Sequence, residues 1–327
     1  MTATVSTGTH GQLTEVSDPE RAVPEFTVAG GPVMAPPDAP IKPGVDGRST
    51  NSTSGSRRRA WWRRRPGLIA AILLVVLVIG WALVPGLFTA ADPLLSVPAS
   101  RLQPPGPEHW FGTDSLGRDM YSRVVHGAAT SLLATALAVL IGLLAGSAIG
   151  LISGAVGGRL DDALMRLVDV LLAIPGLLLA MAVVTALGFG TLNVALAVGL
   201  SAVAAFARLM RSEVMRVKTS VYIEAAAATG ARWWVVLWRH ILPNATGPVL
   251  VLAALEFGAA VLAVSALSFL GYGAPPPAPE WGSLISEGRN YLATSWWLTT
   301  MPGLVVVVLV LAANRISRAL DGERSHR

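Results

Sequence analysis

Two acidic residues stand inside apolar stretches of this sequence, and they are the side chains best placed there to do chemistry. Asp169 lies three residues after Arg166, near the start of one stretch, and Glu256 lies deep in another. A carboxylate is costly in hydrocarbon, so it normally faces the bundle interior or water. There it can relay a proton or bind a cation or a peptide amine. Each has a structural alternative: Asp169 as an interface charge or helix-packing partner, Glu256 as a hydrogen-bonding group between helices.

Other catalytic groups are scarce. The absence of Cys excludes a disulfide framework, a thiolate metal site and a cysteine nucleophile. Lys42 and Lys218 are the only lysines, and neither completes the phosphate loop G-x-x-x-x-G-K-[ST]. The histidines fall in tails and loops, and no two share metal-ligand spacing: His10, His109, His126, His240 and His326. The sequence thus disfavours an intramembrane enzyme, and any ATP that drives this protein must be hydrolysed by another chain.

The elements that must position the two acids are long apolar helices. Hydrophobic residues make up 53% of the 327 residues and charged residues only 14%, whereas soluble proteins carry about 25% charged residues. A helix needs about 20 apolar residues to cross a bilayer. We therefore expect an all-α integral membrane protein. Its six expected spans are residues 68–90, 128–153, 167–187, 191–207, 248–270 and 298–314, the third and fourth forming a tight helical hairpin.

Positive charge is concentrated on one side of these spans. With the N-terminus inside, 18 Lys and Arg residues lie in inner segments and 4 in outer ones. This asymmetry predicts that both termini are cytoplasmic. The net charge of +5 then faces anionic lipid headgroups, and no nucleic acid is needed to explain it. The inner segments are 57–66, 154–166, 208–247 and 315–327, and the outer segments are 91–127, 188–190 and 271–297.

Residues 1–56 differ in composition from residues 57–327, which we expect to form the membrane domain. The tail contains 7 Pro, 7 Gly and 14 Ser or Thr, with a single Phe and no Trp or Tyr. Such a segment buries too little apolar surface to order itself, which predicts a disordered cytoplasmic tail. It also lacks the pattern of a signal peptide. Its role is either that of a dispensable extension or that of a docking or regulatory tail.

The longest ordered inner loop, about residues 211–245, contains the segment YIEAAAATGARWWVVLWRHILPN. Gly230 interrupts an alanine-rich helical pattern and gives the backbone freedom for a turn. Pro243 is expected to end the second short helix. The loop should therefore form a compact helix–turn–helix knob. The alternative is an interfacial helix that places its tryptophans, Trp233, Trp234 and Trp238, in the headgroup belt.

This segment resembles the EAA loop of ATP-binding-cassette (ABC) importer permeases. In that family the loop carries a coupling helix that inserts into a groove on a separate ATPase subunit. His240 departs from the general I-x-L-P ending, and RHILPN is similar to the form found in the peptide and nickel branch. The residues that carry the resemblance, and to which it assigns ATPase coupling, are Glu224, Ala225, Ala226, Gly230, Ile241, Leu242 and Pro243.

Other segments extend the resemblance to roughly residues 60–316. Residues 109–133 and 267–289 are similar to segments of the second permease subunit of that branch, and RLVDVLLAIPGLLLA adds a further match. The family has an acid just before ALSFLG, where this chain has Val264 and Ser265. Glu256 stands two turns earlier, about 12 Å along a helix. Whether it replaces that acid in the translocation path is left open by the sequence.

The resemblance implies a six-span type I importer permease fold in a bacterial plasma membrane. It implies alternating access driven by two ABC ATPase subunits that bind the ATP and magnesium, so this chain would hold no cofactor, no metal and no catalytic residue. Further implied partners are a second, different permease chain and an extracytoplasmic substrate-binding protein, besides membrane lipid. Di- and oligopeptides, nickel chelates, haem and glutathione-like solutes all remain open as cargo.

Two further expectations can be tested against a structure. Residues 112–127 are predicted to form an amphipathic helix at the outer interface, with Asp114–Arg118 and Asp119–Arg123 pairs. This helix would form part of a rim that meets the substrate-delivery protein. The rival function is a proton-coupled secondary transporter that uses the two intramembrane acids. It predicts internal symmetry, usually inverted repeats, and the sequence has no clear repeat.

Overall fold

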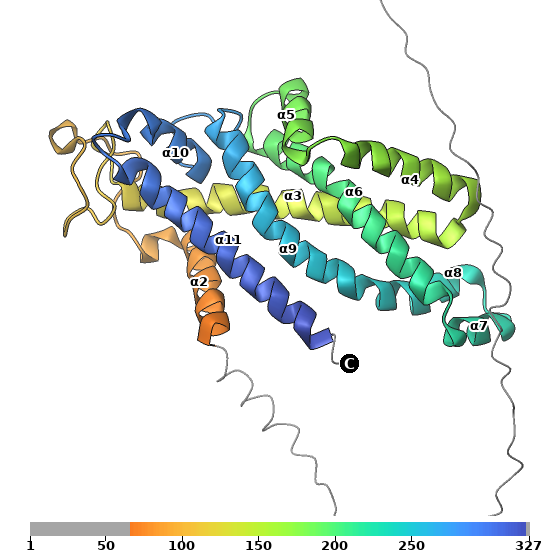
Figure 1. Cartoon of the computed structure of the whole chain (residues 1–327). Coiled ribbons are helices and arrows are strands. Elements are labelled where there is room, and N and C mark those ends of the chain that lie inside the picture. The colour runs from red at the N-terminus through yellow and green to blue at the C-terminus, as the bar shows by residue number, and fades with distance from the viewer. Residues whose placement is uncertain (1–65, 325–327) are drawn as a thin grey trace, which may run out of the picture. The chain divides into compact units, whose positions relative to one another are not determined.

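The computed structural model describes residues 66–324, and every regular element in that range is a helix (Figure 1). The predicted disordered tail, residues 1–56, lies outside the described residues. The long helices are α2 (Pro66–Leu83), α3 (Met120–Val156), α6 (Thr191–Lys218), α9 (Leu242–Phe269) and α11 (Trp297–Arg324). The shorter ones are α4 (Gly158–Ala173), α5 (Gly176–Leu187), α7 (Val221–Ala228), α8 (Trp233–Val236) and α10 (Trp281–Gly288), with single turns η1 (Pro85–Leu87), η2 (Pro98–Ser100), η3 (Leu237–Ile241) and η4 (Arg289–Tyr291).

Five helices in the described range are long and apolar enough to cross a membrane, and one bent pair could supply a sixth span. That pair is α4 and α5, which meet at 95°. The run 167–187, expected as one span, is therefore broken. The break falls at Ile174, which has an extended backbone (φ −93°, ψ 128°), because the ring of Pro175 disfavours the helical conformation in the residue before it.

The helical hairpin expected between the third and fourth runs is confirmed. The segment between α5 and α6 is only three residues long, and its glycines, Gly188 and Gly190, have φ values of 92° and 129°. The side-chain amide of Asn193 donates to the carbonyl oxygens of Leu187 and Gly188, each at 3.1 Å. This amide therefore satisfies carbonyl groups that the end of α5 would otherwise leave without partners.

Helices α3 and α6 pack closely because α3 presents a row of buried glycines to α6. A Cβ atom at Gly146 would lie 2.5 Å from the carbonyl oxygen of Val203 and 2.6 Å from Cβ of Phe206. Both distances are well below van der Waals contact, so only glycine allows this approach, as is common between membrane helices. The row consists of Gly142, Gly146, Gly150 and Gly154.

The two ends of the helical bundle have different structures. At one end, called here the α10 end, lie α10 and the first residues of α3 and α11; the α7 end, opposite, carries α7 and α8 (Figure 1). At the α10 end two buried tryptophans fix the loops to the bundle. Nε1 of Trp281 donates to the carbonyl oxygen of Val124 at 2.9 Å, and Nε1 of Trp297 donates to that of Thr113 at 3.2 Å.

The segment before α3 is not the amphipathic helix expected over residues 112–127. Residues 112–119 form turns, closed by an isolated β-bridge between Thr113 and Asp119. Asp119 is the N-cap of α3, and its carboxylate accepts a hydrogen bond from the backbone N–H of Ser122 at 2.8 Å. The helix begins only after this cap, so the expectation was wrong for its first half.

A buried charge cluster replaces the predicted surface pairs. The Asp114–Arg118 pair forms, with Arg118 Nε 2.6 Å from the carboxylate. Arg123 does not pair with Asp119, because that carboxylate caps the helix. The Arg123 side chain is 0% exposed, and its Nη1 lies 2.8 Å from Asp114 Oδ2 and 2.7 Å from Oε2 of Glu287 in α10. The cluster therefore ties the loop before α3 to α10.

We expect Arg123→Met to lower the free energy of unfolding by about 3 kcal/mol, because it removes the buried one of the two cations that pair with Asp114 and Glu287. The thermal unfolding of the purified, detergent-solubilised chain would measure the effect. Arg289→Met is the matched control, since Arg289 is exposed at the same end and forms no ion pair within residues 66–324. Equal unfolding temperatures for the two variants would show that the cluster does not stabilise the fold.

Candidate coupling loop and transport cavity

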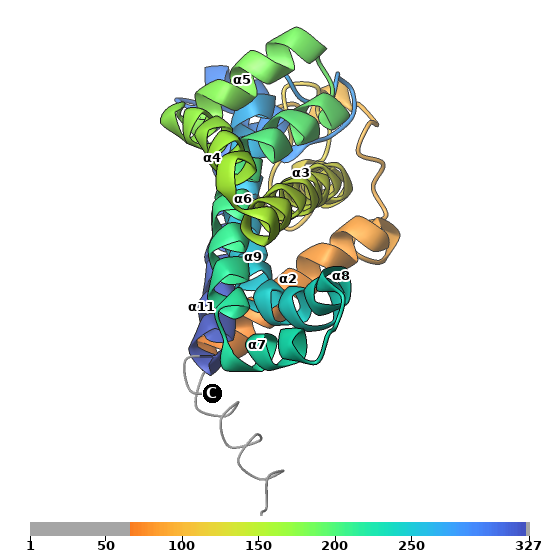
Figure 2. The same cartoon turned by 90° about the vertical axis from the view of Figure 1, so that its right-hand side faces the viewer.

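The loop between α6 and α9 forms the predicted knob. Beyond the end of α6, helices α7 and α8 lie next to each other and are joined by a turn (Figure 2). The predicted turn at Gly230 is confirmed by its φ of 79°, a left-handed conformation that favours glycine. A Cβ atom there would have no other atom within 4 Å. Glycine is therefore required by the backbone conformation of the turn and not by close packing.

Pro243 does not end a helix, which corrects the prediction made from its ring. Residues Leu237–Ile241 form a π-helical turn (η3) in which the N–H of Leu242 donates to the carbonyl oxygen of Leu237. The helix continues through it, from Trp233 to Phe269. Pro243 therefore lies inside this continuous helix, directly after the π-turn, at the start of the part labelled α9. The π-turn accommodates the change of hydrogen-bonding pattern next to the ring.

The residues that resemble the EAA motif divide into two groups by burial. One group packs against the last turns of α6: Ile241 is buried, and Ala226 and Leu242 are partly buried in the same apolar cluster. The other group is exposed and consists of Glu224, Gly230 and Pro243. Ala225 lies in α7, and its side chain is outside what the structure describes. The knob thus has an anchoring side and a free side.

The free side of the knob is rich in aromatic and aliphatic groups. Trp233 and Trp238 are each 64% exposed, and Val221 is 81% exposed. The rings of Trp233 and Trp234 meet edge to face at 6.1 Å, and the guanidinium of Arg232 lies 5.5 Å from the Trp234 ring centre. Large exposed apolar groups gathered in this way mark a contact with a protein or a membrane.

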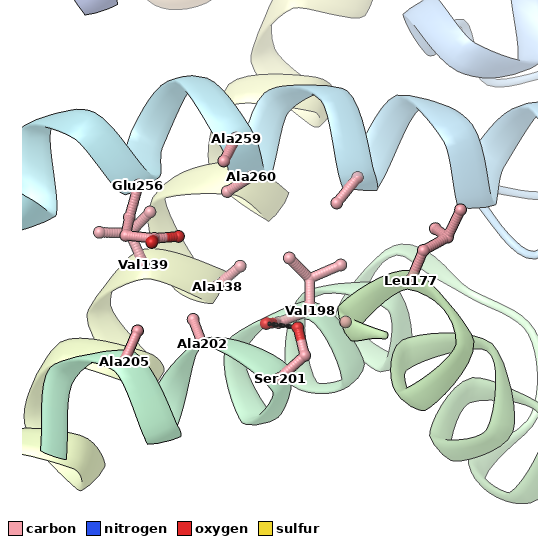
Figure 3. Close-up of a pocket in the computed structure, with 12 residues that line it drawn as sticks. Ala138, Val139, Leu177, Val198, Ser201, Ala202, Ala205, Glu256, Ala259 and Ala260 are labelled. Carbon is pink, nitrogen blue, oxygen red and sulfur yellow. Dashed lines mark hydrogen bonds between the residues drawn. The ribbon is translucent and has the colours of Figure 1, made fainter. Parts of the chain in front are cut away.

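A cavity of about 210 Å³ lies among α3, α5, α6 and α9 (Figure 3). Its walls are mostly small apolar side chains, among them Ala138, Ala202 and Ala260. The polar side chains are those of Ser201 and Glu256. The Ser201 hydroxyl donates a hydrogen bond to the carbonyl oxygen of Val198 at 2.7 Å and is therefore already paired within the protein. Glu256 contributes the carboxyl group of the cavity wall. Glu256, a candidate from the sequence, thus lies on the cavity wall, together with Ser201, which no pattern of the sequence distinguishes.

Asp169 is not part of this cavity. It lies on α4 with its side chain 62% exposed, and its Oδ1 is 2.5 Å from Nη2 of Arg208 on α6. The structure therefore does not bring Asp169 and Glu256 together. The ion pair matches the alternative that Asp169 is a helix-packing partner. Among residues 66–324, no three His, Cys, Asp or Glu side chains are grouped closely enough to hold a metal ion.

A buried carboxylate at the start of α4 escaped the sequence analysis. Asp161, at the start of α4, accepts hydrogen bonds from Nε and Nη2 of Arg211 in α6 at 2.5 and 2.6 Å, and from the hydroxyl of Ser153 in α3. It therefore joins three helices near the knob. The bidentate pair links residues fifty positions apart, so no local spacing rule could have found it.

Comparison with known proteins identifies relatives of the chain. The family described as binding-protein-dependent transport system inner membrane component matches residues 146–325. The dipeptide transport system permease protein DppC of Alkalihalophilus pseudofirmus is 40% identical over 239 residues, which are 73% of this chain and 79% of the relative. The probable D,D-dipeptide transport system permease protein DdpC of Escherichia coli is 41% identical over 216 residues, covering 66% and 72%.

A further relative is named for a different substrate. The glutathione transport system permease protein GsiD of Pectobacterium atrosepticum is also 41% identical over 216 residues, covering 66% of this chain and 72% of the relative.

Among solved structures, an inward-facing conformation of the MetNI methionine ABC transporter aligns with a TM-score of 0.51 at 19% identity, covering 62% of this chain and 97% of that chain. At this level of identity the alignment shows a common fold.

Within the described residues, five apolar helices long enough to cross a membrane define a multi-pass membrane protein. The chain belongs to the family of binding-protein-dependent transport system inner membrane components. It is thus the permease subunit of an ABC importer and not itself an enzyme.

Proposed function

We propose that this permease carries di- or oligopeptides, or related small solutes, across the bacterial plasma membrane by alternating access driven by separate ATPase subunits. The names of its relatives support this cargo, since they include dipeptide and glutathione permeases. The observation that carries the proposal is the knob between α6 and α9, exposed on one side and packed into the bundle on the other.

The knob would transmit the motion of the ATPase to the membrane helices. Ile223 and Val236 are buried in one cluster with Phe206 and Met210 of α6 and with Val249 of α9. A close-packed cluster of this kind moves as a unit, so displacement of the knob would displace both helices. On the free side, Glu224 would supply a polar anchor to the ATPase, and the small residues around it would allow close approach.

The wider assembly follows from the same proposal. Two ABC ATPase subunits would bind ATP and magnesium below the knob. A second permease, a different chain, would complete the pathway, and an extracytoplasmic binding protein would deliver cargo at the α10 end. The distribution of Lys and Arg supports cytoplasmic termini, which puts the α7 end inside. The rival, a proton-coupled transporter, loses support because its two acids lie in different places.

Glu256 would face the cargo in the cavity, where its carboxyl can accept hydrogen bonds from a peptide amine. We expect Glu256→Gln to reduce uptake roughly tenfold, the effect of losing one charge-assisted hydrogen bond. Its expression should match that of the wild type, because the two side chains have the same shape. Uptake of a labelled dipeptide into cells would measure the effect, with Asp162→Asn, an exposed acid outside the cavity, as the control. Unchanged uptake in Glu256→Gln would exclude this role.

Co-purification tests the coupling directly. The tagged chain is extracted in mild detergent, and mass spectrometry identifies the proteins that accompany it. We expect an ATPase with a phosphate-binding loop, and its recovery should fall sharply in the Glu224→Ala variant. If the chain is recovered alone or as a homo-oligomer and uptake is robust without ATP, the secondary transporter becomes the better explanation.

A further inference from the structure

An apolar groove runs between α2 and α11, at the end of the bundle where α2 begins. Its volume is about 300 Å³. Each helix contributes one face with the spacing i, i+3, i+4, i+7, which is a single stripe along a helix. Gly67, Ala70, Ala71 and Leu74 come from α2, and Val308, Leu311, Ala312 and Arg315 come from α11.

A single cation closes one end of this groove. The Arg315 guanidinium lies over the start of α2, since a Cβ atom at Gly67 would be 3.4 Å from its Nη2. Arg315 is exposed, and no ion pair joins it to an acid whose side chain the structure describes, which leaves aside residues 320–324. The sequence places three further arginines, residues 63–65, immediately before α2. Among the described side chains, this end of the groove therefore has a cation and no paired anion.

The rest of the groove is apolar and points along the membrane span. From Gly67 to Leu74 the helix rises about 10 Å. Neighbouring side chains on the outer surfaces of both helices, such as Leu73 and Leu304, are exposed and aliphatic, as expected of surfaces that contact lipid. The groove thus combines a hydrocarbon-like channel with one charged end, the arrangement that complements an amphiphile with an anionic head.

We propose that this groove binds one anionic phospholipid, with an acyl chain between α2 and α11 and its phosphate at Arg315. The proposal rests on the cytoplasmic orientation given above, which puts Arg315 at the leaflet that carries anionic lipids. A guanidinium can donate two parallel hydrogen bonds to a phosphate. A helix of the second permease would fill the apolar part equally well, but it would bury the guanidinium without a counter-charge, which is unfavourable.

The test uses the full chain, purified with the subunits that accompany it, in nanodiscs of mixed phosphatidylglycerol and phosphatidylcholine. After detergent release, native mass spectrometry measures the phospholipid that each assembly retains. The wild type should retain phosphatidylglycerol in preference to phosphatidylcholine, and Arg315→Gln should weaken that retention about tenfold, as expected for a hydrogen-bonded charge. Arg159→Gln, an exposed arginine at the start of α4, in an inner segment and outside the groove, should behave as the wild type.

A second variant tests the apolar channel without changing any charge. Ala70→Leu places a larger side chain on the groove wall at an exposed position, where the fold should tolerate it. It should lower retention of phosphatidylglycerol as Arg315→Gln does.

Three results would overturn the lipid site: no preference for phosphatidylglycerol in the wild type, equal losses in Arg315→Gln and Arg159→Gln, or full retention in Ala70→Leu. Loss of a second permease from Arg315→Gln with lipid unchanged would assign the groove to that subunit instead. Each result can be obtained with the ATPase still bound, so failure of the lipid site is distinguishable from failure of the proposed function.

Discussion

Gly230→Val is expected to abolish ATP-driven uptake while ATP hydrolysis by the assembly continues. The backbone of Gly230 has a φ of 79°, a conformation that costs other residues about 1–2 kcal/mol and β-branched residues more. The turn between α7 and α8 would therefore change its path, and the free side of the knob would no longer match the ATPase. Expression should be normal, because a side chain at this position meets no other atom within 4 Å.

Uptake and ATP hydrolysis would be measured together on the purified assembly in proteoliposomes. Ala231→Val is the matched control, since Ala231 is also exposed and adjoins Gly230, but its φ is not positive. Uptake at the wild-type rate in Gly230→Val would mean that this turn does not set the position of the coupling surface.

Gly150→Val should destabilise the fold itself. A Cβ atom at Gly150 would lie 2.8 Å from Cβ of Met210 and 2.9 Å from the backbone nitrogen of Arg211. Backbone atoms cannot move aside as a flexible side chain can, so α3 and α6 would have to separate. We expect a loss of about 3 kcal/mol, at the upper end of the range for overpacked sites. The unfolding temperature and the yield of monodisperse protein in detergent would both fall.

Gly303→Val separates this effect from the intrinsic preference of valine in a helix. Gly303 is also a helical glycine, but a Cβ atom there would meet nothing within 4 Å. Its variant should unfold near the temperature of the wild type. If both variants were equally stable, close packing of α3 on α6 would not explain the glycine row.

Hydropathy alone predicts most of the membrane helices of this chain, because a spanning segment must be apolar over its whole length and satisfy its backbone internally. Hydropathy does not predict whether an apolar segment forms one straight helix or bends. The run 167–187 is apolar throughout, yet it bends by 95° between α4 and α5. Pro175 indicates the bend, but a hydropathy scale measures only transfer energies and takes no account of the backbone restriction that proline imposes.

Local spacing rules succeed only where the local element is already known. The i, i+4 rule predicted an Asp119–Arg123 pair, but Asp119 caps α3 instead and Arg123 pairs with Glu287, 164 residues away. Pro243 was expected to end a helix, whereas the π-turn before it lets the helix continue. The cap and the π-turn are local alternatives that residue spacing does not distinguish, and the Arg123–Glu287 pair is a tertiary contact that the sequence does not display.

The candidate site residues also divide into those that residue type marks in the sequence and those whose place depends on helix packing. Gly230 and Glu256 were predicted as candidates from residue type and position, because a turn glycine and an intramembrane acid both stand out in their surroundings. Asp169 looked equivalent to Glu256 in the sequence, but it lies on α4, which contributes no residue to the cavity wall, and it pairs with Arg208. Which helix face meets the cavity is decided by packing among α3, α5, α6 and α9.

The most direct test of ATP-driven transport is uptake by the reconstituted assembly under two energy sources. The purified complex is placed in proteoliposomes with its binding protein and a labelled dipeptide, and uptake is measured with ATP supplied on the side of the knob or with a proton gradient alone. Uptake that requires ATP, and that Gly230→Val abolishes, is the predicted result. Uptake driven by the proton gradient in the absence of ATP, and lost in Glu256→Gln, would contradict it.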